Sequence, residues 1–363
     1  MRKAKIEQIE VGAYQVPTDG PEADGTLAWD RTTIVLVTAR AGGAWGLGYS
    51  YTDASAAQLI ETKLGEVVLG TSALAPQAAW RAMVDAVRNL GRQGLAASAI
   101  AAVDVALWDL KARLLDLPLV SLLGACRDAV PVYGSGGFTS YPIERLEAQL
   151  AGWVEQGIGI LKMKVGSEPA ADLERVRAAR AAIGPAAGLF VDANGAYDRK
   201  QALGFAEKFA AYDVCWFEEP VSSDDLAGLR LLRDRAPPGM EITAGEYGYD
   251  LHSFRRMLEA GAVDVLQPDA TRCLGVTGFM QAAALCRCFG RPLSAHTAPA
   301  LHLHLCCAAE AARHIEYFHD HVRIEEMLLN GAQAPRDGAL SPDLARPGLG
   351  LELRAAEAER YAI

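Results

Sequence analysis

Apolar and polar positions alternate along the first fifty residues in the way expected of β-strands. Residues Ile6–Tyr14 alternate, Thr32–Thr38 is β-branched, and Trp45–Tyr51 follows a glycine pair that can turn the chain. This pattern predicts three antiparallel strands. The segment Pro17–Asp30 between the first two strands is polar and interrupted by proline and glycine. We expect it to form a long loop, which in a compact protein is often a lid.

A helical rhythm follows, with apolar residues at three- and four-residue spacing. It predicts helices near residues 54–68, 76–91 and 96–115. The last of these segments carries Asp104 and Asp109 among many apolar residues. We expect these acids to serve packing rather than chemistry.

From Val130 onward, short apolar runs alternate with amphipathic segments. The alternation predicts eight strands joined by helices, which is typical of a parallel (β/α)8 barrel. The predicted strands are Val130–Ser135, Ile160–Lys164, Leu189–Asp192, Val214–Glu218, Glu241–Ala244, Val263–Leu266, Pro292–Ala295 and His314–Phe318. The rhythm fades after about residue 325, and we expect this tail to return to the N-terminal region.

Polar side chains recur where seven successive strands end. Each lies 20–28 residues after the one before, which is about one β/α unit: Lys164, Asp192, Glu218, Glu246, Asp269, His296 and Glu316. Since active sites of such barrels lie at the carboxyl ends of the strands, we expect these side chains to meet at one mouth.

Two lysines share one face of their predicted strand. Lys162 and Lys164 are two residues apart, so their side chains point the same way, roughly 6–7 Å from each other. A nearby like charge disfavours ionisation. We therefore expect a lowered pKa for at least one of them, as a catalytic base near neutral pH requires.

Three carboxylates at this mouth would repel one another without a cation between them. Asp192, Glu218 and Glu246 are hard oxygen ligands of the kind that suit Mg²⁺. Asn194 faces the same side and could orient a ligand or water. Glu219 adjoins the site, and the pattern alone does not decide which of the two neighbouring glutamates binds the metal.

Composition sets the broad class of the protein. The chain has 363 residues and a net charge of −10, which suits two domains and argues against a general nucleic-acid binder. No apolar run approaches the roughly 20 residues that a membrane span needs. Seven irregularly spaced cysteines fit reduced thiols. We expect a cytoplasmic protein without a membrane segment.

Taken together, the motifs resemble those of the enolase superfamily. More narrowly, they resemble its mandelate racemase subgroup, also described as mandelate racemase/muconate lactonizing enzyme-like. They are Lys162-Met163-Lys164, Val191-Asp192-Ala193-Asn194, Trp216-Phe217-Glu218-Glu219-Pro220, Gly245-Glu246, Pro268-Asp269 with Gly275-Val276-Thr277-Gly278, His296, and Ile315-Glu316. The resemblance implies a modified TIM barrel over residues 126–324. It also implies an N-terminal α+β capping domain over 1–125, which we expect the tail 325–363 to complete.

The resemblance also implies a role for each residue. Asp192, Glu218 and Glu246 would hold one Mg²⁺ per subunit, and Lys164 would be one base. His296, paired with Asp269, would be the second base on the opposite face of the substrate. Lys162 would meet the charge that develops on the substrate, to which Glu316 would donate a hydrogen bond.

Two positions depart from the subgroup's pattern. Tyr247 stands where asparagine is common, and this could reshape the pocket. Arg272 stands where lysine is common, and it could brace Glu246 or Asp269.

These roles imply removal of the α-proton of a carboxylate substrate through an enediolate. We favour dehydration of a sugar acid to a 2-keto-3-deoxy acid, in which His296 protonates the departing hydroxyl. A racemase, epimerase or cycloisomerase with the same two bases is the alternative, and a non-catalytic barrel protein is a remote one. The resemblance suggests a homo-oligomer, either a dimer or an octamer.

One histidine pair resembles a metal cluster without being one. His302 and His304 are two residues apart on a predicted helix, so they lie about 200° apart and cannot share a face. We expect both to pack within the fold. His319 could lie near the mouth, but the sequence assigns it no role.

Overall fold

The computed structural model describes residues 4–363, so positions 1–3 of the predicted capping domain lie outside the described residues. An antiparallel sheet of β1 (Gln8–Ala23), β2 (Ala28–Ala41) and β3 (Ala44–Tyr51) opens the chain, in the order β1-β2-β3. The strands confirm the predicted meander. The first two are much longer than their alternating sequence indicated.

The prediction of a long loop over Pro17–Asp30 is wrong. β1 and β2 continue as a hairpin until Ala23 faces Ala28, with a register shift between Pro17 and Glu22. The barrel holds this hairpin in place: the Thr139 hydroxyl donates to the Asp24 carbonyl at 2.8 Å, and the Ser140 hydroxyl donates to that of Pro21 at 2.7 Å. These partners are distant in sequence, which is why local turn residues misled the prediction.

Helices cover one face of this sheet. They are α1 (Ser55–Leu59), a π-helical turn η1 (Ile60–Leu64), α2 (Gly65–Val68), α3 (Pro76–Ala86), α4 (Leu95–Leu114) and α5 (Leu119–Leu123). α4 lies directly against β3, since a Cβ at Gly46 would come within 2.3 Å of the Ala106 carbonyl oxygen. Its acids are structural as expected: Asp104 accepts hydrogen bonds from Thr277, and Asp109 accepts one from the Leu47 amide.

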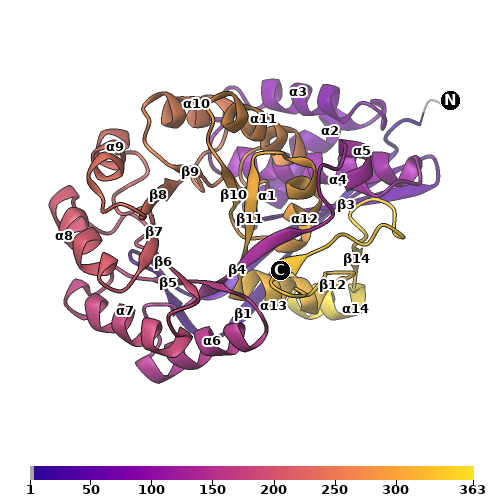
Figure 1. Cartoon of the computed structure of the whole chain (residues 1–363). Helices are drawn as coiled ribbons and strands as arrows, with labels where there is room; N and C mark the ends of the chain where they lie inside the picture. Colours follow the sequence, from indigo (N-terminus) through magenta and orange to yellow (C-terminus); the bar gives the residue numbers. More distant parts are fainter. Residues whose placement is uncertain (1–3) are drawn as a thin grey trace.

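Eight parallel strands then close into a barrel, as Figure 1 shows. They are β4 (Val130–Gly136), β5 (Ile160–Lys164), β6 (Gly188–Asp192), β7 (Val214–Glu218), β8 (Glu241–Ala244), β9 (Val265–Leu266), β10 (Leu293–Ala295) and β11 (Ala312–Phe318). Pairing of β11 with β4 completes the ring. The predicted fold class, a TIM-like barrel with an N-terminal antiparallel capping sheet, is confirmed.

Helices surround the barrel and connect its strands. They are α6 (Ile143–Glu155), α7 (Pro169–Ile183), α8 (Arg199–Ala210), α9 (Leu226–Arg235), α10 (Leu251–Glu259), α11 (Gly275–Cys288) and α12 (Pro299–Ala308). Most of these helices form an outer ring in Figure 1. Apolar side chains of the strands and helices share one continuous core.

An aromatic layer fills the inside of the barrel. Tyr133, Phe190 and Trp216 are buried together, and the rings of Phe190 and Trp216 stack at 4.7 Å. The Trp216 indole N–H donates to the Glu218 carboxylate at 3.1 Å. The layer therefore contacts the acidic strand ends through Trp216 and Glu218.

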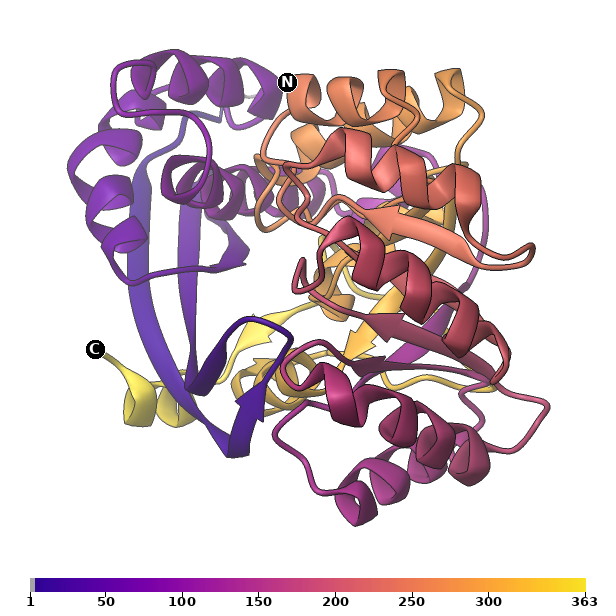
Figure 2. The same cartoon turned by 90° about the vertical axis from the view of Figure 1, so that its left-hand side faces the viewer.

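The chain end returns to the first sheet. α13 (His319–Leu328) leads into β12 (Leu329–Asn330), β13 (Ala339–Leu340), β14 (Glu352–Leu353), α14 (Ala355–Ala358) and the short η2 (Glu359–Tyr361). The Ile363 amide donates to the Ala13 carbonyl at 3.1 Å. Figure 2 shows this C-terminal segment beside the long strands of the capping sheet. The division at 125/126 and 324/325 stays a prediction.

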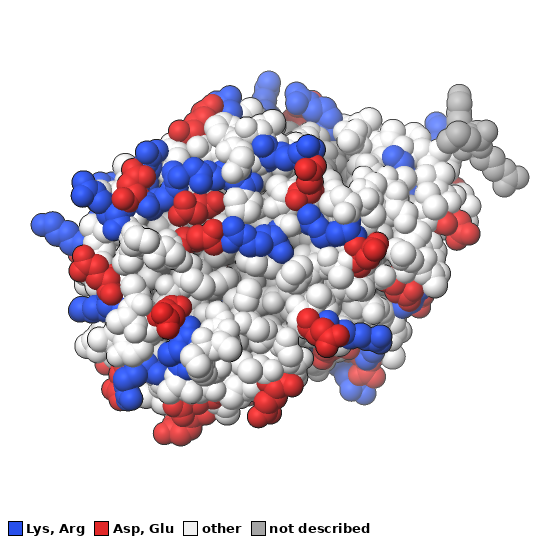
Figure 3. All heavy atoms as spheres, in the orientation of Figure 1, with Lys and Arg blue, Asp and Glu red and all other residues white. Residues whose placement is uncertain are grey.

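Two surface properties bear on the expected partners. Across residues 4–363, none of the helices combines the length and apolar character that a bilayer span demands. Basic and acidic side chains lie interspersed over the face drawn in Figure 3.

Candidate active site

The barrel brings all seven predicted strand-end residues to its mouth. Lys164, Asp192 and Glu218 are the last residues of β5, β6 and β7. Glu246, Asp269 and His296 follow β8, β9 and β10, and Glu316 lies within β11. Each of them is 5% exposed or less, so the surroundings of these charges are protein rather than water.

Three carboxylates form a group that fits a divalent ion. One oxygen each from Asp192, Glu218 and Glu246 lies within 4.8 Å of the others. Within the described residues, Oε1 of Glu218 is buried and has no hydrogen-bond partner. Burial and the Asp192 charge raise the pKa of Glu218 to about 8. An oxygen-only donor set of three clustered carboxylates matches the ligands that Mg²⁺ prefers.

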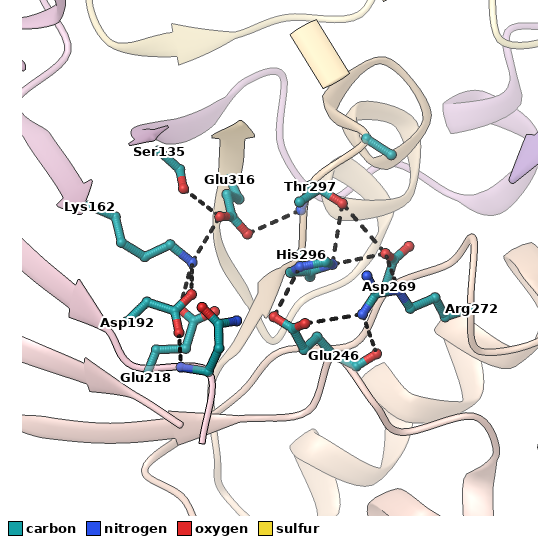
Figure 4. A network of polar contacts seen from close by, with 12 residues as sticks. Ser135, Lys162, Asp192, Glu218, Glu246, Asp269, Arg272, His296, Thr297 and Glu316 are labelled. Atoms are coloured by element: carbon teal, nitrogen blue, oxygen red, sulfur yellow. Dashed lines mark hydrogen bonds and ion pairs between the residues drawn. The ribbon is translucent and has the colours of Figure 1, made fainter. Parts of the chain in front are cut away.

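Lys162 links two sides of the mouth, as Figure 4 shows. Its Nζ lies 2.7 Å from Glu218, 2.8 Å from Glu316 and 3.4 Å from Asp192. Glu316 also accepts from the Ser135 hydroxyl at 2.6 Å. Burial alone lowers the pKa of Lys162, but the surrounding carboxylates raise it well above its usual value. Lys162 is thus a fixed positive charge.

The expectation of a lowered lysine pKa is wrong for this arrangement. Lys164 Nζ lies 2.5 Å from Asp192 Oδ2. Burial and the charge of Lys162 lower the pKa of Lys164, yet the Asp192 carboxylate outweighs them and raises it. The prediction considered the second lysine and omitted the nearby acids.

His296 and Asp269 form a hydrogen-bonded pair on the other side of the mouth. His296 Nδ1 lies 2.9 Å from Asp269 Oδ2, while the Thr271 amide donates to Asp269 Oδ1 at 2.7 Å. His296 Nε2 lies 3.1 Å from Glu246. Burial lowers the pKa of His296, but Glu246 and the bond to Asp269 raise it to about 10. The imidazole is therefore charged in this arrangement.

Arg272 braces both acids that the sequence suggested. Its guanidinium lies 3.1 Å from Glu246 and 3.7 Å from Asp269. The same group lies over the Tyr247 ring, 5.2 Å from the centroid. Arg272 therefore connects the metal-ligand candidate Glu246 with the His296–Asp269 pair. Tyr247 is its partly exposed neighbour.

Asn194 and Glu219 lie beside the carboxylates in strained backbone conformations. Their φ angles are 46° and 36°, in a region that side-chain-bearing residues seldom adopt and that is often found at functional sites. The Asn194 amide donates to Asp192 at 2.9 Å. Among the described residues, Asn194 Oδ1 and Glu219 Oε1 are buried without partners. Both side chains are thus available to a ligand or bound water.

A cavity of about 420 Å³ opens above these groups. Its lining comes from both parts of the fold, including Asp24 and Trp29 of the hairpin, Tyr51 of β3, and His321 of α13. Sequence reasoning placed Asp24 and Trp29 in a possible lid but gave these residues no specific role, and it gave none to Ser135 or Trp216. Ser135 lies near the end of the first barrel strand, so the strand-end rule could have found it.

Three further histidines, His302, His304 and His319, pack within the fold or against the hairpin. The Ala270 amide donates to His302 Nε2 at 2.9 Å, and the Val120 amide donates to His304 Nδ1 at 3.2 Å. Both side chains are buried, which confirms the packing role predicted for them. His319 lies beside Asp19 of the hairpin rather than among the catalytic candidates.

The capping sheet, the closed barrel and this acidic mouth define an enzyme of the enolase superfamily. Residues 9–124 match the family described as the mandelate racemase/muconate lactonizing enzyme N-terminal domain. Residues 145–358 match the enolase C-terminal domain-like family. The chain belongs to the mandelate racemase/muconate lactonizing enzyme family.

Relatives of known activity are similar over nearly the whole chain. L-talarate/galactarate dehydratase of Salmonella typhimurium is 32% identical, over 96% of this chain and 89% of its own. 3,6-anhydro-α-L-galactonate cycloisomerase of Streptomyces coelicolor is 33% identical, over 99% of both chains. Family membership is therefore shared by enzymes with different reactions.

Two solved structures are similar in fold. A mandelate racemase/muconate lactonizing enzyme-like protein of Rubrobacter xylanophilus has a TM-score of 0.97 at 55% identity, over 99% of this chain and 100% of its own. The Salmonella typhimurium dehydratase, solved with Mg and L-lyxarohydroxamate, has a TM-score of 0.91 at 30% identity. That comparison covers 100% of this chain and 94% of the other.

Proposed function

We propose that this enzyme is a Mg²⁺-dependent dehydratase that converts a sugar acid to a 2-keto-3-deoxy acid. The observation that carries the proposal is the placement of two proton-transfer side chains around the cluster of three carboxylates. Lys164 ends β5 and His296 follows β10. β4 and β11 separate these strands on one side of the ring, and β6–β9 separate them on the other.

Asp192, Glu218 and Glu246 would hold the metal ion. When bound, Mg²⁺ supplies a Lewis acid that stabilises negative charge on the substrate carboxylate. Lys162 adds a second fixed positive charge from inside the barrel. Both act on the charge that appears when the α-proton leaves, which is where preorganised electrostatics lowers a barrier most.

Lys164 is the proposed base for the α-proton, and it must first be neutral. Its contact with Asp192 opposes deprotonation. A carboxylate that shares its charge with a bound cation attracts the ammonium group less strongly. The base form of Lys164 is therefore expected in the metal-loaded enzyme rather than in the metal-free one.

His296 is the proposed general acid. Its bond to Asp269, which is not a proposed metal ligand, favours the charged imidazole, so His296 can give a proton to the β-hydroxyl as the C–O bond breaks and water leaves. The resulting enol becomes the 2-keto acid by taking up a proton at the β-carbon. Asp24, Thr32 and Asn194 give the cavity polar groups that suit the other hydroxyls of a sugar acid.

Glu316 needs a proton to act as the hydrogen-bond donor that the resemblance implies. Burial raises the pKa of Glu316, but Lys162 outweighs it and brings the pKa to about 2. Here the carboxylate accepts bonds from Ser135 and from the Thr297 amide. A donor role therefore requires Glu316 to take up a proton when substrate binds.

A cycloisomerase or racemase is the second candidate. The 33% identical cycloisomerase spans 99% of both chains, about as similar as the dehydratase. In such a reaction one group removes a proton and the other returns one, and no hydroxyl leaves as water. The same Lys164 and His296 would serve, so the chemistry of the product decides between the candidates.

Incubation in D₂O with Mg²⁺ and a panel of sugar acids and their lactones tests the proposal. A 2-keto-3-deoxy acid, detected as a semicarbazone, is the expected product. Deuterium incorporation into a product of unchanged composition would support the second candidate and contradict the first. No turnover and no exchange across the panel would contradict both.

Single variants then assign the two groups. Lys164→Ala and His296→Asn should each reduce turnover by a factor of roughly 10² to 10⁴, the range of general acid–base catalysis. Lys200→Ala, at an exposed lysine on α8, is the matched control and should keep full turnover. Full turnover in both active-site variants would contradict the assignment. The cytoplasmic location and the dimer or octamer stay predictions from the sequence.

A further inference from the structure

A second cluster of metal-type ligands lies between the hairpin and the barrel, away from the carboxylate group in the mouth. One ligand atom each from Asp19, Glu22 and His319 lies within 4.8 Å of the others. Asp19 and Glu22 belong to β1, and His319 is the first residue of α13. The cluster therefore joins two parts of the chain some 300 positions apart in sequence.

Asp19 and His319 already contact each other at the rim. Asp19 Oδ2 lies 3.0 Å from His319 Nε2, and Asp19 Oδ1 accepts a bond from Arg145 at 2.9 Å. Their side chains are 40% and 25% exposed, so an ion can reach them from solvent.

Glu22 supplies the independent indication of a ligand. Its side chain is only 1% exposed, and Oε2 accepts a bond from the Trp29 indole at 2.8 Å. Among residues 4–363, Oε1 is buried without a hydrogen-bond partner, and no basic side chain forms an ion pair with this carboxylate. A buried, unpaired carboxylate is costly unless a proton or a cation compensates it.

We infer that Asp19, Glu22 and His319 form a second divalent-cation site, selective for an ion such as Zn²⁺ over Mg²⁺. The donor set decides the class of ion. Imidazole nitrogen suits zinc and its neighbours in the first transition row, whereas Mg²⁺ prefers oxygen ligands and retains water. Zinc ligands lie at about 2.0–2.2 Å, which places tetrahedral donor atoms roughly 3.3–3.6 Å apart. The cluster needs only a small closing movement to reach that geometry.

The ion would fasten the hairpin to the barrel. Asp24, two residues after Glu22, lines the cavity above the carboxylate mouth. The hairpin also meets the rest of the fold through hydrogen bonds from Thr139, Ser140 and Arg323 and an ion pair from Arg145. A metal bridge between β1 and α13 would restrain the same wall of the cavity.

Zinc uptake by the whole protein tests the inference. The chain is stripped with a chelator, saturated with Mg²⁺, and titrated with Zn²⁺ by calorimetry. The expected result is uptake of one equivalent of Zn²⁺ despite excess Mg²⁺. Glu22→Gln and His319→Gln should each lose it while keeping their melting temperature and their Mg²⁺ uptake.

Two controls separate this site from other metal-binding groups. Glu10→Gln, at a partly exposed acid of the same strand, should bind Zn²⁺ as the parent does. Co²⁺ in place of Zn²⁺ should show no thiolate charge-transfer band, which excludes the exposed Cys126 and Cys288. Zinc uptake that survives His319→Gln, or that Glu218→Gln alone abolishes, would overturn the inference. So would a parent protein that takes up no Zn²⁺.

Discussion

Asp269→Asn is the substitution whose consequence the geometry defines most closely. The Thr271 amide donates to Asp269 Oδ1 at 2.7 Å, and this bond is buried. An asparagine that keeps this bond presents its NH₂ group to His296 Nδ1. His296 must then accept at Nδ1 and carry its only proton at Nε2, so the ring is held neutral and no longer serves as the charged general acid.

The size of the effect follows from two costs of keeping a proton on His296 Nδ1 in the variant. The charge-assisted bond between His296 and Asp269 is lost, at about 1.5–3 kcal/mol. A rotated amide would leave the Thr271 N–H without its partner, at about 1–3 kcal/mol. Together these cost roughly 3–6 kcal/mol, or a factor of about 10² to 10⁴ in kcat at about 1.4 kcal/mol per factor of ten.

Two assays follow this change. Turnover of the acid identified in the substrate panel reports kcat, and ¹⁵N NMR of the His296 ring reports its tautomer independently of activity. We expect both ring nitrogens to carry a proton in the parent and only Nε2 to carry one in the neutral ring of the variant. Asp234→Asn, at an exposed acid on α9, is the matched control. A variant within tenfold of the parent kcat, with Nδ1 still protonated, would refute the reasoning.

Three further changes probe the metal group, a buried acid and the packing of the cap. Mg²⁺ should raise the melting temperature of the parent but not of Glu218→Gln, because a ligand that binds the folded state stabilises it; an equal rise in both would contradict the ligand assignment. Burial raises the pKa of Asp104 to about 8 despite its bonds from Thr277, so the folded chain holds a proton that the unfolded chain releases. The stability that this proton confers is complete below about pH 4 and is lost as the pH rises through about 8. In urea unfolding at pH 5 and 9, Asp104→Asn should remove that fall, which is roughly 4 kcal/mol at about 1.36 kcal/mol per pKa unit. Identical pH profiles of the variant and the parent would count against it. Gly46→Ala should lower the free energy of unfolding by roughly 2–4 kcal/mol, since its Cβ would collide with the backbone of α4. The control Gly152→Ala, in α6, meets nothing within 4 Å and should be neutral or slightly stabilising. Equal unfolding midpoints for the two variants would show that the close approach does not matter.

The periodic parts of the sequence predicted most of the barrel and its mouth. Strand ends such as Lys164, Asp192 and Glu218 recur once per β/α unit, so their convergence follows from the closed parallel sheet. Ser135 also lies near a strand end, and it was missed because a serine there carries no strong chemical signal.

Contacts between distant segments explain what the sequence did not predict. Pro17–Asp30 contains turn-forming residues, yet barrel residues such as Thr139 and Ser140 hold it as a paired hairpin. The pKa of Lys164 likewise depends on Asp192, which lies one strand away in space and 28 positions away in sequence. Local patterns indicate such elements but not the charges that tertiary structure places beside them.

A single divalent ion is expected in the barrel mouth, among side chains brought from seven strands. Anomalous diffraction from crystals soaked in Mn²⁺, an ion with similar ligand preferences, tests it directly. We predict a peak in the barrel mouth about 2 Å from carboxylate oxygens of Asp192, Glu218 and Glu246, with Lys164 and His296 on opposite sides of it. A barrel mouth without a peak, or a peak with both side chains on the same side, would contradict the account.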